Sequence, residues 1–323
     1  MRYFCTYFDH HYSARGLALY QSLKRHCPEF KLWILCLDEL SRSELTRLNL
    51  PEASLLTLDE LESDDPALLG AKENRSRIEY YFTCTPSLPL FILRHNLAVD
   101  LITYLDADLF FFSSVAPLFQ EMETKSIAII AHRFAPAFRH CEWNGIFNVG
   151  WVSFRRDEQG LACLQWWRER CLEWCYDRIE ENKFADQKYL DDWPTRFRNV
   201  VVLQHKGANL APWNVGNYRI SIRDGVILVD DQPLIFFHFH AFQQVAGWIY
   251  DTQLAKFRVI PSKVVVQEIY APYIREVMLQ AARLGYSGLA PLQNKRNKSD
   301  GLFRGSARLL KRQYLIVAKG RVV

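Results

Sequence analysis

The first sixty residues alternate between strand patterns and helix patterns, and this alternation constrains the fold more than any other feature of the chain. In chain order the patterns are a strand at 2–8, a helix at 13–26, a strand at 31–37, a helix at 43–48, a strand at 55–58 and a helix at 58–61. Strands that alternate with helices favour a parallel sheet with helices on both of its faces.

The composition indicates a folded chain with a large core. Of 323 residues, 49% are hydrophobic and 14% are aromatic, which excludes intrinsic disorder. The length suits one large α/β domain with additions, or roughly two domain-equivalents. A core of that size folds without a disulfide or a metal.

The rest of the chain continues this mixture. We predict strands at 100–104, 127–131, 147–154, 200–203 and 235–240, and helices at 74–82, 88–95, 161–182 and 264–284. The first two of these helices are separated because Pro86 and Pro89 interrupt the pattern. Neither GxGxxG nor a GxxxxGKS or GxxxxGKT motif occurs, so a dinucleotide or P-loop site would lack its phosphate cradle.

Positive charge is concentrated at the C-terminal end. Residues 294–323 contain nine basic residues and one acidic residue, which leaves a net charge of −4 on the remainder of a chain whose total is +4. Because this charge is local, a nucleic-acid partner is not indicated. Leu302 to Val317 has the composition of a basic amphipathic helix, which could lie on an anionic membrane near a lipid-linked acceptor. A solvated helix or a disordered tail is the alternative.

The compartment is predicted from what the sequence lacks. The start, MRYFCTYFDHH, has no basic segment followed by a sustained apolar stretch, and no run reaches the ~18 apolar residues that span a bilayer. We therefore expect a cytoplasmic protein, with peripheral membrane contact only through the tail. Cys163, Cys171 and Cys175 are then expected to be buried reduced thiols rather than zinc ligands.

The segment with the clearest chemical meaning is LITYLDADLFFFS, residues 101–113. Asp106 and Asp108 are two apart, so on an extended segment their side chains point to the same side. Two carboxylates at the end of a buried strand need a positive partner, and a divalent cation such as Mg²⁺ or Mn²⁺ is the natural one. Such an ion could neutralise the charge of a departing diphosphate. The alternative is a solvated turn with two incidental aspartates.

Two further stretches carry polar groups of interest. His238 and His240 share one side of the strand predicted at 235–240, and an Asp, Asp, His set would suit Mn²⁺. A histidine of the core is the alternative for each. Asp186 and Gln187, followed downstream by Trp213 and Asn214, offer groups that bind sugar hydroxyls and apolar sugar faces. Helix capping and surface aromatics are the alternative there.

These segments, in this order, carry a resemblance to a known family. Asp106-Ala107-Asp108 matches an Asp-x-Asp motif, and Asn148 with Gly150 resembles an Asn-x-Gly segment. Asp186-Gln187 and Leu190 resemble an Asp-Gln-Asp-x-Leu-Asn segment, and Trp213-Asn214 follows at a corresponding distance. The segment from His238 to Ala241, followed by Trp248, resembles a His-x-x-Gly element followed by Trp. Over residues 2–250 the chain resembles the GT-A glycosyltransferases, most of all family 8.

The resemblance implies an α/β GT-A fold, with a mixed central sheet flanked by helices. Residues 1–260 would be the catalytic domain, and 261–323 a helical extension with a basic tail from about 294. The implied activity is transfer of a sugar from a nucleoside-diphosphate donor such as a UDP-sugar to a glycan or lipid-linked acceptor, as in polysaccharide biosynthesis. It would depend on Mn²⁺ or Mg²⁺ and retain the anomeric configuration.

The resemblance also implies roles for individual residues. Asp106, Asp108 and His238 would hold the metal, and Asp106 would also touch the ribose. The nucleotide would contact Thr6, Tyr7, Asp9 and Tyr12, with Arg75 or Arg77 at the diphosphate or ribose. Asn148, Asp186 and Gln187 would line the sugar pocket, and the last two would act at the anomeric centre.

The sequence departs from the family pattern at four places. Lys188 replaces the third acidic residue of Asp-Gln-Asp, and Asp191 replaces the Asn. Ala241 stands where Gly is usual, and no Lys-Pro precedes Trp248. These departures leave open whether His238 or His240 holds the metal.

Two other classes of protein are alternatives. Haloacid-dehalogenase-like phosphatases also place Asp-x-Asp after an apolar strand, although Phe110 stands where they need Thr or Val. A protein that binds a nucleotide-sugar or glycan without turnover is the second.

Overall fold

The computed structural model describes residues 1–289, 314–318 and 321–322, which fall into two units interleaved along the chain. The first unit comprises Met1–Asp9, Cys27–Ala107 and Val115–His205; the second comprises His10–His26, Asp108–Ser114 and the described residues from Lys206 onward. The boundary after Ala107 assigns one carboxylate of the Asp-Ala-Asp triplet to each unit. The limit of the catalytic domain near residue 260 stays a prediction.

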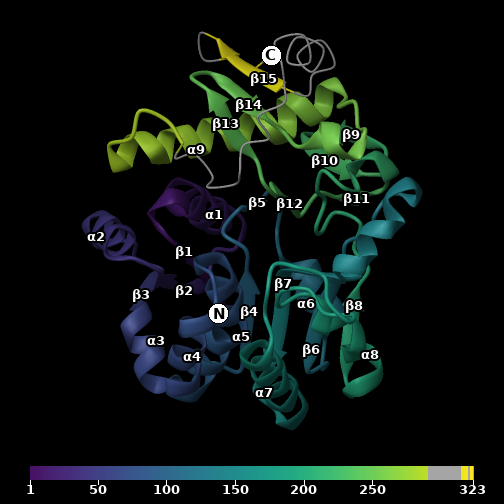
Figure 1. Ribbon diagram of the computed structural model, residues 1–323. Coiled ribbons are helices and arrows are strands. Elements are labelled where there is room, and N and C mark those ends of the chain that lie inside the picture. Colours follow the sequence, from purple (N-terminus) through teal and green to yellow (C-terminus); the bar gives the residue numbers. More distant parts are fainter. Residues whose placement is uncertain (290–313, 319–320, 323) are drawn as a thin grey trace. The chain divides into compact units, whose positions relative to one another are not determined.

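A seven-stranded sheet forms the centre of the first unit (Figure 1). In sheet order its strands are β3 Ala53–Thr57, β2 Phe30–Cys36, β1 Arg2–Phe8, β4 Leu101–Leu105, β7 Phe147–Arg155, β6 Ile127–Ala131 and β8 Val200–Leu203. β7 runs antiparallel to β4 and to β6, whereas the remaining neighbours in this sheet are parallel. The predicted mixed sheet is confirmed, and each predicted strand of this unit is present.

Helices cover this sheet and complete the core of the unit. They are α2 Glu39–Leu48, α3 Leu58–Asp64, α4 Pro66–Ala71, α5 Arg77–His95, α6 Ala116–Met122, α7 Glu158–Glu173 and α8 Trp193–Arg196, with the 3-10 helices η2 Lys72–Asn74, η3 Pro136–Asn144 and η4 Lys188–Asp192. Phe154 of β7, Trp167 of α7 and Trp193 of α8 are fully buried and contact one another. Cys163, Cys171 and Cys175 are buried free thiols in the same core, as expected.

The predicted break at Pro86 and Pro89 is wrong, because α5 runs without interruption from Arg77 to His95. Each proline removes one backbone hydrogen bond of the helix. The face that carries them is nevertheless buried, with Cys84, Leu88 and Ile92 fully enclosed in the core. Burial of several large apolar side chains, at about 1.5–3 kcal/mol each, outweighs the cost of a proline in a helix.

The helix predicted at 161–182 begins earlier and ends earlier, as α7 at Glu158–Glu173. Asp157 caps its start by accepting a hydrogen bond from the backbone N–H of Gly160 at 2.8 Å. At its end, the backbone of Trp174 is extended. Glu180 and Lys183 then pair as the ends of a tight turn, which is incompatible with a continued helix.

The second unit contains helix α1 Ser13–His26, which packs against the short strand β5 Leu109–Phe111 and against α9 Ala271–Leu284. β5 pairs antiparallel with β12 Phe236–His238. The other described elements are β9 Ile220–Arg223, β10 Val226–Val229, β11 Gln232–Pro233, β13 Gln243–Ala246, β14 Ile249–Asp251, the 3-10 helices η1 His10–Tyr12, η5 Val215–Asn217 and η6 Leu254–Phe257, and the π-helix η7 Val265–Tyr270. The helix predicted at 264–284 is confirmed as η7 and α9.

The C-terminal prediction is wrong where it can be tested. Tyr314–Ala318 forms strand β15, which pairs antiparallel with β14 and with β16 Arg321–Val322. This strand rules out a helix that reaches Val317, and its Tyr, Ile and Val residues are of the types that favour strands. The remainder of the predicted amphipathic helix, up to residue 313, lies outside the described residues. In the part of the chain that the structure describes, no helix combines the length and apolar character needed to cross a bilayer.

Candidate functional site

A cluster of one aspartate and two histidines lies in the second unit. In the β5–β12 pair His238 is opposite Leu109, and the backbone N–H of Phe239 donates to the Asp108 carbonyl at 3.0 Å. This register places the Asp108 side chain beside His238, with Oδ1 and Nε2 3.1 Å apart. One ligand atom each from Asp108, His238 and His240 lie within 4.8 Å of one another.

The surroundings of this cluster favour an ionised carboxylate. Asp108 and His238 are buried, and His240 is exposed. Burial alone would raise the pKa of Asp108, but His238, then His240 and Arg15, hold that pKa below its usual value. Enclosure by protein atoms and the neighbouring His238 lower the pKa of the His240 side chain to about 4, even though part of the residue faces solvent. A neutral imidazole is the form that binds a metal.

The arrangement fits a divalent cation. Ligands in adjacent positions around an ion, each at ~2.1 Å, are about 3 Å apart, which is the separation found between Asp108 and His238. Two imidazoles and a carboxylate are softer than the all-oxygen sets that Mg²⁺ prefers. The sequence left His238 and His240 as alternatives, whereas the structure brings both to Asp108.

Trp213 and Arg15 complete the surroundings of the cluster. The Trp213 ring meets both imidazoles edge to face, at 5.2 Å from His238 and 5.6 Å from His240. Asn214, also predicted as a sugar contact, accepts a hydrogen bond from the Ala211 N–H and donates one to the Asn209 carbonyl, each at 2.9 Å. Arg15, which sequence analysis missed, is 1% exposed and donates to the Phe242 carbonyl at 3.2 Å. A lone arginine on the apolar face of helix 13–26 was the available signal.

Ala241 gives a physical reason for the glycine that the family pattern places there. Its φ is 54°, in the left-handed region where an L side chain is strained. Glycine adopts this conformation without that cost. The departure from the pattern therefore places a strained alanine directly after His240.

The first unit contains an acid–tyrosine cluster, formed by Tyr7, Thr85, Tyr104, Asp106 and Asp186. The Tyr104 hydroxyl donates to Asp106 Oδ1 at 3.0 Å, and the Tyr7 and Thr85 hydroxyls are 3.0 Å apart. Burial is the main reason that the pKa of Asp186 is raised to about 7. The charge of Asp106 also raises this pKa, whereas the hydrogen bond with Thr85 lowers it. Burial and both carboxylates raise the pKa of Tyr7 far above its ordinary value, so its hydroxyl stays a neutral donor.

The first unit also contains an amide cluster, formed by Asn148, Gln187 and His132, in which Gln187 directly follows Asp186 in sequence. Asn148 Nδ2 lies 3.3 Å from Gln187 Oε1 and 3.3 Å from His132 Nε2. Gln187 Nε2 donates to the carbonyl of Asn144 at 2.8 Å. Gly145 must be glycine, because its φ is 129° and a Cβ atom would lie 3.0 Å from the Gln187 side chain. The structure thus brings together Asn148 and Gln187, which were both predicted to contact the sugar. Sequence analysis did not predict that His132 belongs to this cluster.

The remaining predicted nucleotide contacts lie on several elements, which belong to both units. Thr6 is fully buried in β1, and its hydroxyl has no hydrogen-bond partner among the described residues. Asp9 is buried at the end of the same stretch, whereas Tyr12 belongs to the second unit, where Arg15 lies over its ring. Arg75 donates to the Leu172 carbonyl at 3.1 Å and stacks on Tyr176, so it supports the end of α7. Arg77 is exposed at the start of α5.

Two sequence relatives place the chain in a family. It is 32% identical to the uncharacterized protein YfnD of Bacillus subtilis (strain 168) over 275 residues, which are 84% of this chain and 87% of YfnD. It is 34% identical to the uncharacterized protein YfnF of the same strain over 251 residues, 75% of this chain and 82% of YfnF. The chain belongs to the YfnD and YfnF family. No general family model matches it.

Solved structures confirm the fold of this YfnD and YfnF family member. The galactosyltransferase LgtC in complex with donor and acceptor sugar analogs superposes with a TM-score of 0.50, at 16% identity, over 81% of this chain and 98% of LgtC. The predicted GT-A glycosyltransferase fold is therefore correct. At this level of identity the likeness concerns the fold alone.

Proposed function

We propose that the chain is a metal-dependent glycosyltransferase. It transfers a sugar from a nucleoside-diphosphate donor, a UDP-sugar, to a glycan or lipid-linked acceptor, with retention as in family 8. The observation that carries this proposal is the Asp108, His238 and His240 cluster in a chain with the GT-A fold. The same fold removes the fold-level support for a haloacid-dehalogenase-like phosphatase.

The cluster is where the diphosphate of the donor would be held. Asp108, His238 and His240 would coordinate a divalent ion, with Asp106 proposed as a further ligand and ribose contact. The ion, Mn²⁺ rather than Mg²⁺, supplies charge neutralisation for the departing diphosphate. Arg15 adds a fixed positive charge, because its guanidinium is held by two backbone carbonyls of its own unit, those of His11 and Phe242.

The sugar and the nucleotide would be held by the predicted residues of the acid–tyrosine and amide clusters and by their neighbours. Asn148 and Gln187 have their amides oriented by each other and by Asn144, which suits recognition of sugar hydroxyls. Asp186 would face the positive charge that develops at the anomeric carbon, and that charge would favour its ionised form. Thr6, Tyr7, Asp9 and Tyr12 would contact the nucleotide, with Arg77 or Arg75 at its phosphates or ribose.

The test is release of nucleoside diphosphate from a panel of nucleotide-sugars, measured with Mn²⁺, with Mg²⁺ and with EDTA. We expect metal-dependent release that Asp108→Asn reduces by at least a hundredfold, on the scale of about 3 kcal/mol for a group that stabilises developing charge. Asp224→Asn is the matched control, because Asp224 is exposed in the turn after β9 of the same unit. Donor binding without release from any donor would instead establish a binding protein without turnover.

A further inference from the structure

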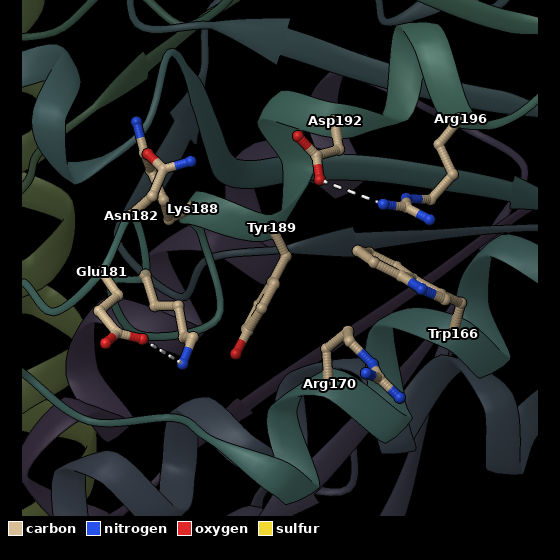
Figure 2. Close-up of a pocket in the computed structure, with 9 residues that line it drawn as sticks. Trp166, Arg170, Glu181, Asn182, Lys188, Tyr189, Asp192 and Arg196 are labelled. Atoms are coloured by element: carbon tan, nitrogen blue, oxygen red, sulfur yellow. Dashed lines mark hydrogen bonds and ion pairs between the residues drawn. The ribbon is translucent and has the colours of Figure 1, made fainter.

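A cavity of about 340 Å³ lies in the first unit, and none of the residues that line it has been assigned a role above. Its walls are α7, the turn at 181–183 and the segment formed by η4 and α8. Figure 2 shows Tyr189 pointing into its middle, with Trp166 and Arg170 on one side and Glu181 and Asn182 on the other. This volume is at the lower end of the range for ligand sites and suits one or two sugar residues.

The lining favours polar ligands. It contains two aromatic rings, one amide and six charged side chains, and no aliphatic residue. The Trp166 and Tyr189 rings meet at 88° with their centroids 6.1 Å apart, which forms an aromatic corner. Aromatic faces together with charged and amide groups recognise a ring that is apolar on its faces and polar around its edge.

The charge that faces the cavity is positive. Arg170, Lys183, Lys188 and Arg196 line it against two acidic residues, Glu181 and Asp192. Lys183 pairs with Glu181 at 3.9 Å and Arg196 with Asp192 at 3.4 Å, both within the lining. The acids that pair with Arg170 and Lys188 are Glu173 and Asp191, which lie outside the lining, so the lining side chains carry a net charge of +2. The Arg196 guanidinium lies 4.6 Å from the centre of the Trp166 ring and pairs with Asp192 (Figure 2). Both partners of this pair are exposed, so an anionic ligand could replace Asp192 at little cost.

The turn that closes the cavity is strained. Glu181 and Asn182 both have left-handed backbones, with φ of 44° and 67°. A two-residue turn of this kind favours Asn-Gly, so glutamate at its first position is unfavourable. The turn persists because Glu180 and Lys183 exchange backbone hydrogen bonds of 3.1 and 2.8 Å. It presents the Asn182 amide and the Lys183 ammonium to the cavity, and strain of this type is concentrated at ligand sites.

The cavity shares two walls with the segment proposed to contact the donor sugar. On α7, Trp166 lines the cavity while the next residue, Trp167, donates from Nε1 to the Asp186 carbonyl at 2.8 Å. On the other wall, Lys188 directly follows Gln187. A ligand in the cavity would therefore contact residues adjacent in sequence to those that hold Asp186 and Gln187.

We propose that this cavity binds an acidic saccharide, a sugar residue that carries a carboxylate or a phosphate, as part of the acceptor glycan. The choice of a saccharide rests on the proposed function, whereas the anionic character follows from the lining. The sugar ring lies in the corner of Trp166 and Tyr189, and its anionic group meets Arg170, Arg196 and Lys183.

The test is calorimetric titration of the full chain in EDTA without donor, so that its result does not depend on catalysis. The probes are a linear trimer of hexuronic acid, a hexose 6-phosphate, a neutral hexose trisaccharide and inorganic phosphate. We expect at least one of the two acidic sugars to bind at least tenfold more tightly than the neutral trisaccharide and phosphate, and which of them does so identifies the anionic group. Arg196→Gln and Lys183→Gln should each weaken that binding about fivefold to tenfold.

Arg42→Gln is the matched control, since Arg42 is an exposed arginine on α2 that pairs only with Glu39 three residues earlier among the contacts described. If Arg196→Gln fails to fold, Lys183→Gln still tests the proposal. Lys183 ends the turn and its side chain is 35% exposed, so its replacement should leave the fold intact. Equal binding of the neutral trisaccharide, equal binding of inorganic phosphate, or affinities that neither variant changes would each overturn the proposal. Failure of donor turnover with intact acidic-saccharide binding would count against the proposed function alone.

Discussion

Lys188 and Asp191 form an ion pair of 2.8 Å, and each also binds the backbone of one neighbouring segment. Lys188 Nζ donates to the Glu142 carbonyl at 3.0 Å, and the Ile146 N–H donates to Asp191 Oδ1 at 2.7 Å. Between these anchors, Asn144 accepts the hydrogen bond from Gln187. The two departures from the family motif therefore compensate each other, and together they hold the segment that orients Gln187.

The first prediction concerns this pair. Its side chains are 10% and 14% exposed, so Lys188→Met leaves a largely buried carboxylate without its partner. We expect a loss of about 3 kcal/mol in the free energy of unfolding, measured by denaturant titration. The double variant with Asp191→Asn should lose less than the sum of the single losses.

The charge-swapped variant, Lys188→Asp with Asp191→Lys, is a stricter test of the same pair. We expect no recovery of stability, because the Glu142 carbonyl needs a donor at position 188 and the Ile146 N–H needs an acceptor at 191. Full recovery would mean that only the ion pair matters. Lys125→Asp, at an exposed position of the same unit, controls for the effect of reversing one charge.

The second prediction concerns Ala241, whose φ is 54°. Ala241→Gly removes left-handed strain of about 1–2 kcal/mol but adds about 0.4–1 kcal/mol of unfolded-state entropy. We expect a net gain in unfolding free energy of up to about 1.6 kcal/mol, seen as a higher melting temperature. Ala18→Gly in α1, where the backbone is helical, should instead destabilise the protein. A lower melting temperature for Ala241→Gly would contradict the strain argument.

The third prediction is a pH dependence of stability through Asp186. Because its pKa in the folded state is about 7, above the ~3.9 of an unfolded aspartate, its contribution is complete below pH 4 and is lost as the pH rises through 7. The loss amounts to about 4 kcal/mol, because a difference of one between the folded and unfolded pKa values corresponds to about 1.36 kcal/mol. Asp186→Asn cannot ionise and should lack this decline.

The measurement is the difference in unfolding free energy between the unmodified protein and Asp186→Asn from pH 4 to pH 8, in EDTA. Groups common to both proteins cancel in this difference. Parallel pH profiles would show that Asp186 keeps an ordinary pKa in the folded protein.

The fourth prediction concerns the metal. At a hundredfold excess over its dissociation constant, a ligand that binds only the folded protein adds about 2.7 kcal/mol of stability. We expect Mn²⁺ to raise the melting temperature more than Mg²⁺ does. His238→Ala and His240→Ala should each abolish most of the increase, since both imidazoles lie within reach of Asp108. His95→Ala, an exposed histidine of α5, should leave it unchanged. An undiminished increase in both cluster variants would contradict the assignment.

Local patterns predicted the strands well, because a buried strand needs a run of apolar residues that is visible in a short window. β1, β2, β4 and β7 are within one or two residues of their predicted limits. Helix limits were predicted less well. Pro86 and Pro89 are strong local signals against a helix, and the core overrode them. α7 ends at Glu173 because the backbone of Trp174 is extended, and no glycine or proline follows at 174–180 to signal this end.

By itself, the sequence determined which residues have side chains that could bind a metal or a sugar. It also placed Asp106, Asp108 and His238 near strand ends. Charge, side-chain type and strand periodicity are local properties, so a short stretch of sequence shows them. Only the tertiary structure decided that both His238 and His240 reach Asp108, that Arg15 lies beside them, and that Lys188 pairs with Asp191 over the backbone of 142–146. The contacts around Asp108 join residues that are distant in sequence. Lys188 and Asp191 are close in sequence, but both bind the backbone of the distant segment 142–146. They depend on strand register and packing, which no short window of sequence specifies.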